Sequence, residues 1–129
     1  MNEPSEKVDA IAATVVDACI EVHRILGPGY LESIYEEALA IELTLRGIPF
    51  ERQRSININY KGNQADQGRV DFLVAEILVV ELKTVEAFAP IHTAQVISYL
   101  KATGLSVSLL LNFNTALMKQ GIKRIVLTH

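Results

Sequence analysis

The 129-residue chain lacks the residues that mark several protein classes. It has one cysteine and no tryptophan, so an intramolecular disulfide cannot form and the disulfide-rich scaffolds are excluded. No apolar run approaches the roughly 20 residues of a membrane-spanning helix. The N-terminal segment is polar where a signal peptide would be basic and then apolar. We therefore expect a soluble, cytoplasmic protein with no membrane partner.

The chain also lacks an excess of positive charge, because its formal net charge is −3 and its pI is about 5.6. This balance excludes a large basic surface that grips nucleic acid tightly. Any nucleic-acid binding must therefore be local, metal-assisted or weak. By contrast, 50% of the residues are hydrophobic, which excludes a disordered chain. We expect one domain over residues 1–129.

Apolar periodicity predicts the order of the elements. Spacings of three and four indicate a helix that contains Cys19 as a small core residue and ends at Gly27-Pro28-Gly29. A second helix should span about 31–46, with an apolar face of Ile34, Ala38, Ile41 and Leu45. The predicted strands span about 56–60, 68–74, 78–83, 107–111 and 122–127, and a third helix spans 92–103. The order ααβββαββ predicts an α/β fold with a mixed sheet flanked by helices.

Three charged residues interrupt the most apolar stretch of the chain: Asp71, Glu81 and Lys83. An unpaired buried charge costs several kcal/mol, so this cluster is the first candidate for a functional site. If a three-residue turn joins the two strands, Val74 pairs with Leu78. The continued register then places Asp71 directly opposite Glu81.

The same register predicts that Lys83 lies beside the acids and faces Arg69. The other face of the hairpin would be apolar and consist of Val70, Phe72, Val74, Leu78, Val80 and Leu82. Two opposing carboxylates repel each other unless a cation lies between them. Two acids and a backbone carbonyl suit Mg²⁺ or Mn²⁺, and a nearby lysine can orient or activate water. The alternative is a cross-strand salt-bridge ladder in which Arg69 and Lys83 pair with the acids.

These residues resemble the active-site motif of the PD-(D/E)xK nuclease superfamily, which has the restriction-endonuclease-like fold. Val70 stands where that name has proline, at a position that commonly varies. Within the superfamily, the segment from Gly29 to Tyr35 resembles the signature of the GxxExxY family. The pair Gln95 and Tyr99 is similar to the Gln-x-x-x-Tyr motif of RecB-like nucleases.

The resemblance implies a set of catalytic and metal-binding residues: Asp71, Glu81, the backbone carbonyl of Leu82, Lys83 and Glu32. It also implies three supporting residues that orient the site: Gln95, Tyr99 and Tyr35. Glu32 is equally explained as an acid favoured by the helix dipole, and Tyr35 as a core aromatic. His92 could contact phosphate, with a capping or surface role as the simpler explanation. His23 falls roughly where RecB-like enzymes place a histidine metal ligand, a role that Glu32 already fills in the GxxExxY pattern.

The implied activity is Mg²⁺- or Mn²⁺-dependent hydrolysis of phosphodiester bonds in nucleic acid. DNA is favoured over RNA by analogy alone, and a homodimer or a larger nucleic-acid-processing complex fits such a small nuclease. The alternative is a catalytically inactive module of the same fold that serves in nucleic-acid binding or oligomerisation, which the acidic net charge favours. The densest basic stretch either follows a phosphate backbone or guards a strand edge, and it comprises Arg46, Arg52, Arg54 and Lys61.

Overall fold

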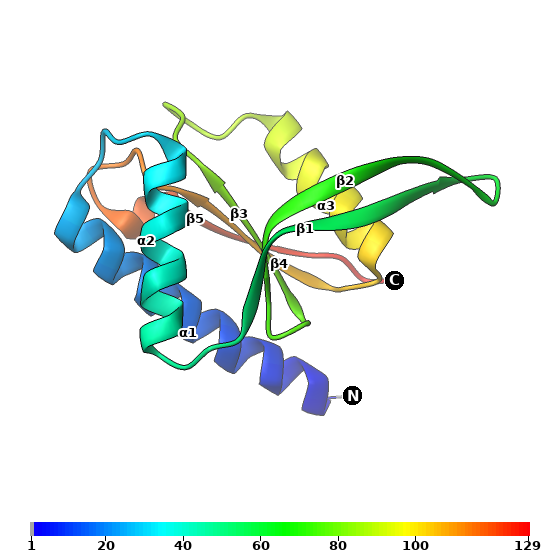
Figure 1. Ribbon diagram of the computed structural model, residues 1–129, viewed down its shortest axis with the longest axis horizontal. Coiled ribbons are helices and arrows are strands. Elements are labelled where there is room, and N and C mark those ends of the chain that lie inside the picture. Colours follow the sequence, from blue (N-terminus) through cyan, green and yellow to red (C-terminus); the bar gives the residue numbers. More distant parts are fainter. Residues whose placement is uncertain (1) are drawn as a thin grey trace.

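The computed structural model describes residues 2–129, with side chains described from residue 6 onward. The predicted order of helices and strands is confirmed, and one short 3₁₀ helix, η1, is added (Figure 1). The elements are α1 (Asn2–Leu26), α2 (Glu32–Leu45), β1 (Phe50–Tyr60), β2 (Asn63–Val74), β3 (Leu78–Lys83), α3 (Pro90–Thr103), β4 (Val107–Asn112), η1 (Met118–Gly121) and β5 (Ile122–Val126).

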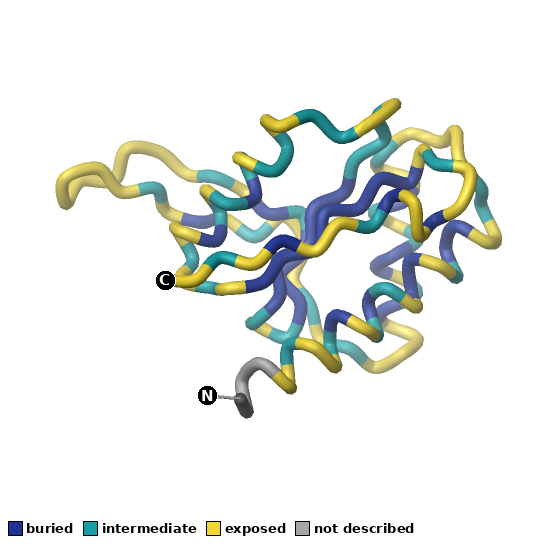
Figure 2. Tube along the Cα trace, turned by 180° about the vertical axis from the view of Figure 1, so that it is seen from behind, coloured by how far each residue is buried: buried dark blue, intermediate teal, exposed yellow. Residues whose placement is uncertain are grey.

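The five strands form one mixed sheet in the order β1-β2-β3-β4-β5. Only β3 and β4 pair in parallel, and α3 supplies the crossover that a parallel pair requires. One core cluster joins α1 and α2 to the sheet, and a second joins α3 to the opposite face. Because both faces are covered, β3 and β4 are buried almost throughout their length (Figure 2).

The predicted apolar face of α2 is wrong. Ile34, Ile41 and Leu45 are 44%, 55% and 76% exposed, and only Ala38 of that set packs against the core. The helix carries two apolar stripes, and the one that contains an aromatic ring and two leucines buries the larger area. Its members are Tyr35, Leu39, Ala40 and Leu43.

The β2–β3 turn is confirmed, because Val74 pairs with Leu78. The ladder ends at the pair of Phe72 and Val80, however, so the predicted opposition of Arg69 and Lys83 does not form. The single apolar face is also wrong, since Val70 packs in the α3 cluster and Phe72 in the α1–α2 cluster. At the same level of the sheet, Gln53 of β1 has a φ of 51°, and it does not pair with Asp71 although its neighbours pair with β2 on both sides.

Beyond this irregularity, β1 and β2 leave the sheet together. They continue as a two-stranded arm, residues 54–69, that projects from the body of the molecule (Figure 1). Most of the arm is exposed (Figure 2). Cys19 is buried in the core, as predicted. Across residues 2–129, no helix has both the length and the apolar character needed to cross a membrane.

Candidate active site

The candidate site lies where β2 separates from β3, in a gap between the two strands that we call the opening. There, two side chains replace the missing ladder bonds: the Asp71 backbone N–H donates to Glu81 Oε2 over 2.6 Å, and the Leu82 N–H donates to Asp71 Oδ2 over 2.8 Å. Separated strands would otherwise leave these two N–H groups unpaired, which is costly inside a protein. The two acids therefore meet across the opening, although they lie outside the regular ladder.

Burial dominates the electrostatics of the site. Glu81 is only 3% exposed, and burial, followed by the nearby charge of Asp71, raises its pKa to about 8. Burial also raises the pKa of Asp71, and hydrogen bonds from the Leu82 N–H and the Gln53 amide partly oppose this effect. The pKa of Glu32 is raised by burial and then by Asp71. All three groups thus favour protonation or a compensating cation.

The alternative explanation, a cross-strand salt-bridge ladder, does not hold. Among the residues that the structure describes, the ion pairs include none formed by Asp71, Glu81 or Lys83. Lys83 Nζ instead donates to Gln95 Oε1 over 3.2 Å. The lysine is thus held near the acids without being paired to either of them.

Helix α3 positions the lysine through Gln95 and Tyr99. These residues lie one helical turn apart, and Gln95 Nε2 donates to the Tyr99 hydroxyl over 3.3 Å. The Tyr99 ring covers Gly68 at the root of the arm, where an added Cβ would lie 3.1 Å from a ring carbon. Burial, and then the charge of Glu81, raises the pKa of Tyr99. The chain Lys83–Gln95–Tyr99 therefore links the site to the arm.

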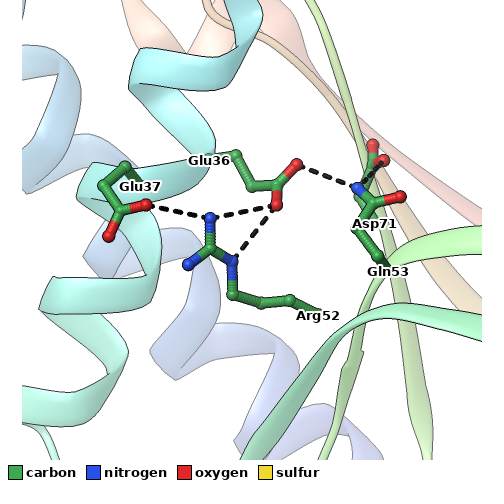
Figure 3. A network of polar contacts seen from close by, with 5 residues as sticks. All are labelled: Glu36, Glu37, Arg52, Gln53 and Asp71. Carbon is green, nitrogen blue, oxygen red and sulfur yellow. Dashed lines mark hydrogen bonds and ion pairs between the residues drawn. The ribbon is translucent and has the colours of Figure 1, made fainter.

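Helix α2 brings two further acids to the site. Glu32 is the first residue of the helix, and its carboxyl interacts electrostatically with Asp71 and Lys83. Glu36 was not predicted, although its position one turn after Glu32 places it on the same helix face. Glu36 Oε1 accepts a 3.0 Å hydrogen bond from Gln53 Nε2, which also donates to Asp71 Oδ1 over 3.1 Å (Figure 3).

Gln53 is a second residue that the sequence interpretation missed. Its position depends on the positive φ at the irregularity in β1, and no spacing in the sequence indicates it. In the same network, Arg52 forms ion pairs of 3.1 Å with Glu36 and Glu37 (Figure 3). The amide of Gln53 thus joins the acids of α2 to Asp71.

Most of the basic stretch is neutralised. Besides Arg52, Arg46 pairs with Glu42, and Arg54 pairs with Glu51. The ammonium group of Lys61 lies over the Tyr60 ring, 5.3 Å from its centroid. The three arginines are therefore held by acids, which favours the strand-edge explanation over a continuous track for phosphates.

Tyr35 lies in the core, away from the carboxylates. Its ring stacks on Phe113 with centroids 4.6 Å apart. Its hydroxyl donates to the Gly27 carbonyl over 2.5 Å and accepts from the Tyr30 N–H over 3.2 Å. Tyr35 therefore holds the loop that leads into α2 in place. Its influence on the site is indirect, through the position of Glu32 at the start of that helix.

Both histidines that were considered have structural partners. The ring Nε2 of His23 lies 2.8 Å from the Thr115 carbonyl oxygen. His92 Nδ1 accepts a 2.9 Å hydrogen bond from the Ala89 N–H and so caps α3. The capping explanation of His92 is confirmed.

Asn112 is a further positioning residue that the sequence interpretation missed. It is buried, and its Oδ1 accepts hydrogen bonds from the Val85 and Asn114 N–H groups, both over 3.1 Å. Its Nδ2 donates to the Val85 carbonyl over 2.8 Å. The side chain thereby fixes the segment that follows Lys83. A polar residue at the end of an otherwise apolar strand was the available signal.

The donor chemistry at the opening fits a hard divalent cation. The Lys83 carbonyl accepts from the Phe113 N–H on the β4 side, and neighbouring carbonyls alternate along a strand, so the Leu82 carbonyl points toward the opening. Two carboxylates and a carbonyl are the oxygen ligands that Mg²⁺ and Mn²⁺ prefer. Among the side chains of residues 6–129, no group of three acidic, histidine or cysteine side chains is arranged around one metal position. Asp71, Glu81 and the Leu82 carbonyl are the groups at the opening that would hold such a cation.

Comparison with known protein families identifies the family of this chain. A family model described as the PD-(D/E)XK nuclease superfamily matches residues 9–125, nearly the whole chain. The matched range includes both acids of the opening, Lys83 and the Gln95–Tyr99 pair. No curated protein and no solved structure matches the chain. The match, the mixed α/β sheet and the cluster at the β2–β3 opening together show that this chain belongs to the PD-(D/E)XK nuclease superfamily.

Proposed function

We propose that this protein hydrolyses phosphodiester bonds in nucleic acid at the opening between β2 and β3. Members of the superfamily are typically nucleases that use divalent metals. The observation that carries the proposal is the meeting of the buried Glu81 carboxylate and the half-buried Asp71 carboxylate. Beside them, Lys83 bonds to Gln95 and forms no ion pair with any acid among the described side chains. Such a site attracts a divalent cation and, with it, a phosphate group.

Each residue has a distinct proposed role. Asp71, Glu81 and the Leu82 carbonyl hold Mg²⁺ or Mn²⁺, and the metal supplies Lewis-acid stabilisation of charge on the phosphate. Lys83 orients the attacking water or stabilises developing negative charge through its ammonium group. Gln95 and Tyr99 orient Lys83. Glu32 adds a third negative charge, as expected for membership of the GxxExxY family, which we propose on the Gly29–Tyr35 segment.

The inactive module remains the second candidate because of one observation. Both carboxylates accept hydrogen bonds from backbone N–H groups, so metal binding requires them to exchange these partners or to share their oxygens. Titration calorimetry separates the two candidates: Mn²⁺ binding that is lost in both Asp71→Asn and Glu81→Gln supports the nuclease. Absence of Mn²⁺ binding by the unmodified protein supports the module.

The direct test is cleavage of duplex, nicked and single-stranded DNA and of RNA in Mg²⁺ or Mn²⁺. Lys83→Ala and Asp71→Ala should each lose roughly 100-fold or more of the activity, as expected when a group acting on the reacting water or phosphate is removed. Lys119→Ala, an exposed lysine on η1, is the matched control and should retain activity. Cleavage that is unchanged in Lys83→Ala would refute the assignment.

A further inference from the structure

The arm formed by β1 and β2 has two chemically different faces. Residues paired across two antiparallel strands point to the same side, and the observed register pairs Ser55 with Arg69, Asn57 with Gln67 and Asn59 with Gln64. We call this side the amide face. It consists of six residues, all of them exposed: Ser55, Asn57, Asn59, Gln64, Gln67 and Arg69.

The opposite face of the arm turns toward α3. Ile56 packs in the α3 cluster, with Ile58 against it, and Tyr99 covers Gly68. The only carboxylate between residues 54 and 69, Asp66, pairs with Ile58 and therefore lies on this opposite face. The amide face thus carries one positive charge and no negative charge, on a chain whose net charge is −3.

The side-chain amides of this face have no partner within the protein. Two side-chain hydrogen bonds begin and end between Ser55 and Arg69: Asn63 Nδ2 donates to the Lys61 carbonyl, and Asp66 Oδ1 accepts from the Gln67 backbone N–H. Both of these side chains lie outside the amide face. Among the residues that the structure describes, the amides of Asn57, Asn59, Gln64 and Gln67 donate to and accept from no other residue. Each therefore presents a free donor and a free acceptor.

This shape and chemistry match the major groove of B-DNA. That groove admits a two-stranded β-ribbon, and Asn or Gln can bond both N6 and N7 of an adenine edge. The major groove of duplex RNA is too deep and narrow for side chains to read. Arg69 can in addition contact a phosphate or a guanine edge.

The amide face also leads to the candidate active site. Arg69 lies two residues before Asp71 on β2, so the root of the amide face adjoins the candidate active site. On β1, Gln53 lies two residues before Ser55 and donates directly to Asp71. A duplex held along the amide face would therefore extend toward the two carboxylates.

We propose that the arm inserts its amide face into the major groove of duplex DNA and reads adenine edges beside the acidic site. The inference rests on the proposed function in that it names the substrate: double-stranded DNA, with a preference for A·T pairs where the arm makes contact. The binding itself requires no metal and no cleavage.

Binding is therefore tested in EDTA, by fluorescence anisotropy with three labelled probes of one sequence: the DNA duplex, its single strand and the RNA duplex. The unmodified protein should bind the DNA duplex most tightly. Asn57→Ala/Gln67→Ala should weaken duplex binding roughly 10- to 100-fold. Asn114→Ala, an exposed amide outside the arm, is the control and should bind as the unmodified protein does. A thermal melt of each variant shows that it is folded.

Arg69→Gln supplies a second readout. Loss of one phosphate contact should reduce the slope of log affinity against log salt by about 1, whereas Lys119→Gln should leave that slope unchanged. The inference is overturned if the arm variant binds duplex DNA like Asn114→Ala, if RNA duplex binds as tightly as DNA duplex, or if no probe binds.

Cleavage in Mn²⁺ is scored separately, so the two proposals fail separately. Arm-dependent duplex binding without any cleavage would leave the arm assignment intact and refute the nuclease. Cleavage that does not depend on the arm would support the nuclease and refute the arm.

Discussion

Replacing Glu81 by Gln should stabilise the metal-free protein at alkaline pH. Glutamine is nearly isosteric and keeps an oxygen that accepts from the Asp71 N–H, but it cannot ionise. In the folded protein the pKa of Glu81 is raised from 4.5 to about 8. Between these values the folded state holds a proton that the unfolded state has released. The free energy of unfolding of the unmodified protein should therefore fall as pH rises through this window.

The magnitude follows from the same shift. One pKa unit corresponds to 1.36 kcal/mol, so a rise from 4.5 to about 8 sets an upper limit of about 5 kcal/mol. Water and neighbouring dipoles relax around an ionised buried acid, which reduces the effect. We expect the free energy of unfolding of Glu81→Gln to be about 2 kcal/mol larger than that of the unmodified protein at pH 9 in EDTA. Near pH 5 the two free energies should be the same.

Urea unfolding at a series of pH values measures this difference. Glu76→Gln, which changes an exposed glutamate in the β2–β3 turn, is the matched control and should show no such pH dependence. A difference between Glu81→Gln and the unmodified protein that stays constant from pH 5 to pH 9 would refute the reasoning. It would mean that Glu81 ionises in the folded protein without a significant cost.

Three further predictions concern the metal and the fold. Mn²⁺ should raise the Tm of the unmodified protein, because it binds only the folded state, and the increase should be lost in Glu81→Gln; equal increases in scanning calorimetry would contradict the proposed ligand. Asn112→Ala leaves partly buried backbone groups of Val85 unpaired and should cost about 2 kcal/mol in chemical denaturation, so a cost near zero would show that water replaces the side chain. Leu43→Ala should cost about 2–5 kcal/mol, whereas the exposed Leu45→Ala should cost less than 1 kcal/mol; similar costs would contradict the observed face of α2.

The sequence by itself determined the order of elements, because local periodicity and turn residues carry that information. The stop at Gly27-Pro28-Gly29 and the boundaries of β3 were predicted closely. The three-residue turn after Val74 was also sufficient to bring Asp71 near Glu81, since a short turn sets the register of its two strands. The motif acids and lysine could therefore be identified before the fold was known.

Only the tertiary structure decided which side of each element faces the core. The face of α2 depended on competition between two apolar stripes, and packing against Phe113 selected the one with Tyr35. The ladder between β2 and β3 ended after three pairs, at the level where Gln53 and Asp71 drop out of the pairing between β1 and β2. That separation exposes the Asp71 and Leu82 N–H groups to the two carboxylates, and it also frees the arm. Such effects arise between segments distant in sequence, so no local pattern could have predicted Gln53, Glu36 or the amide face.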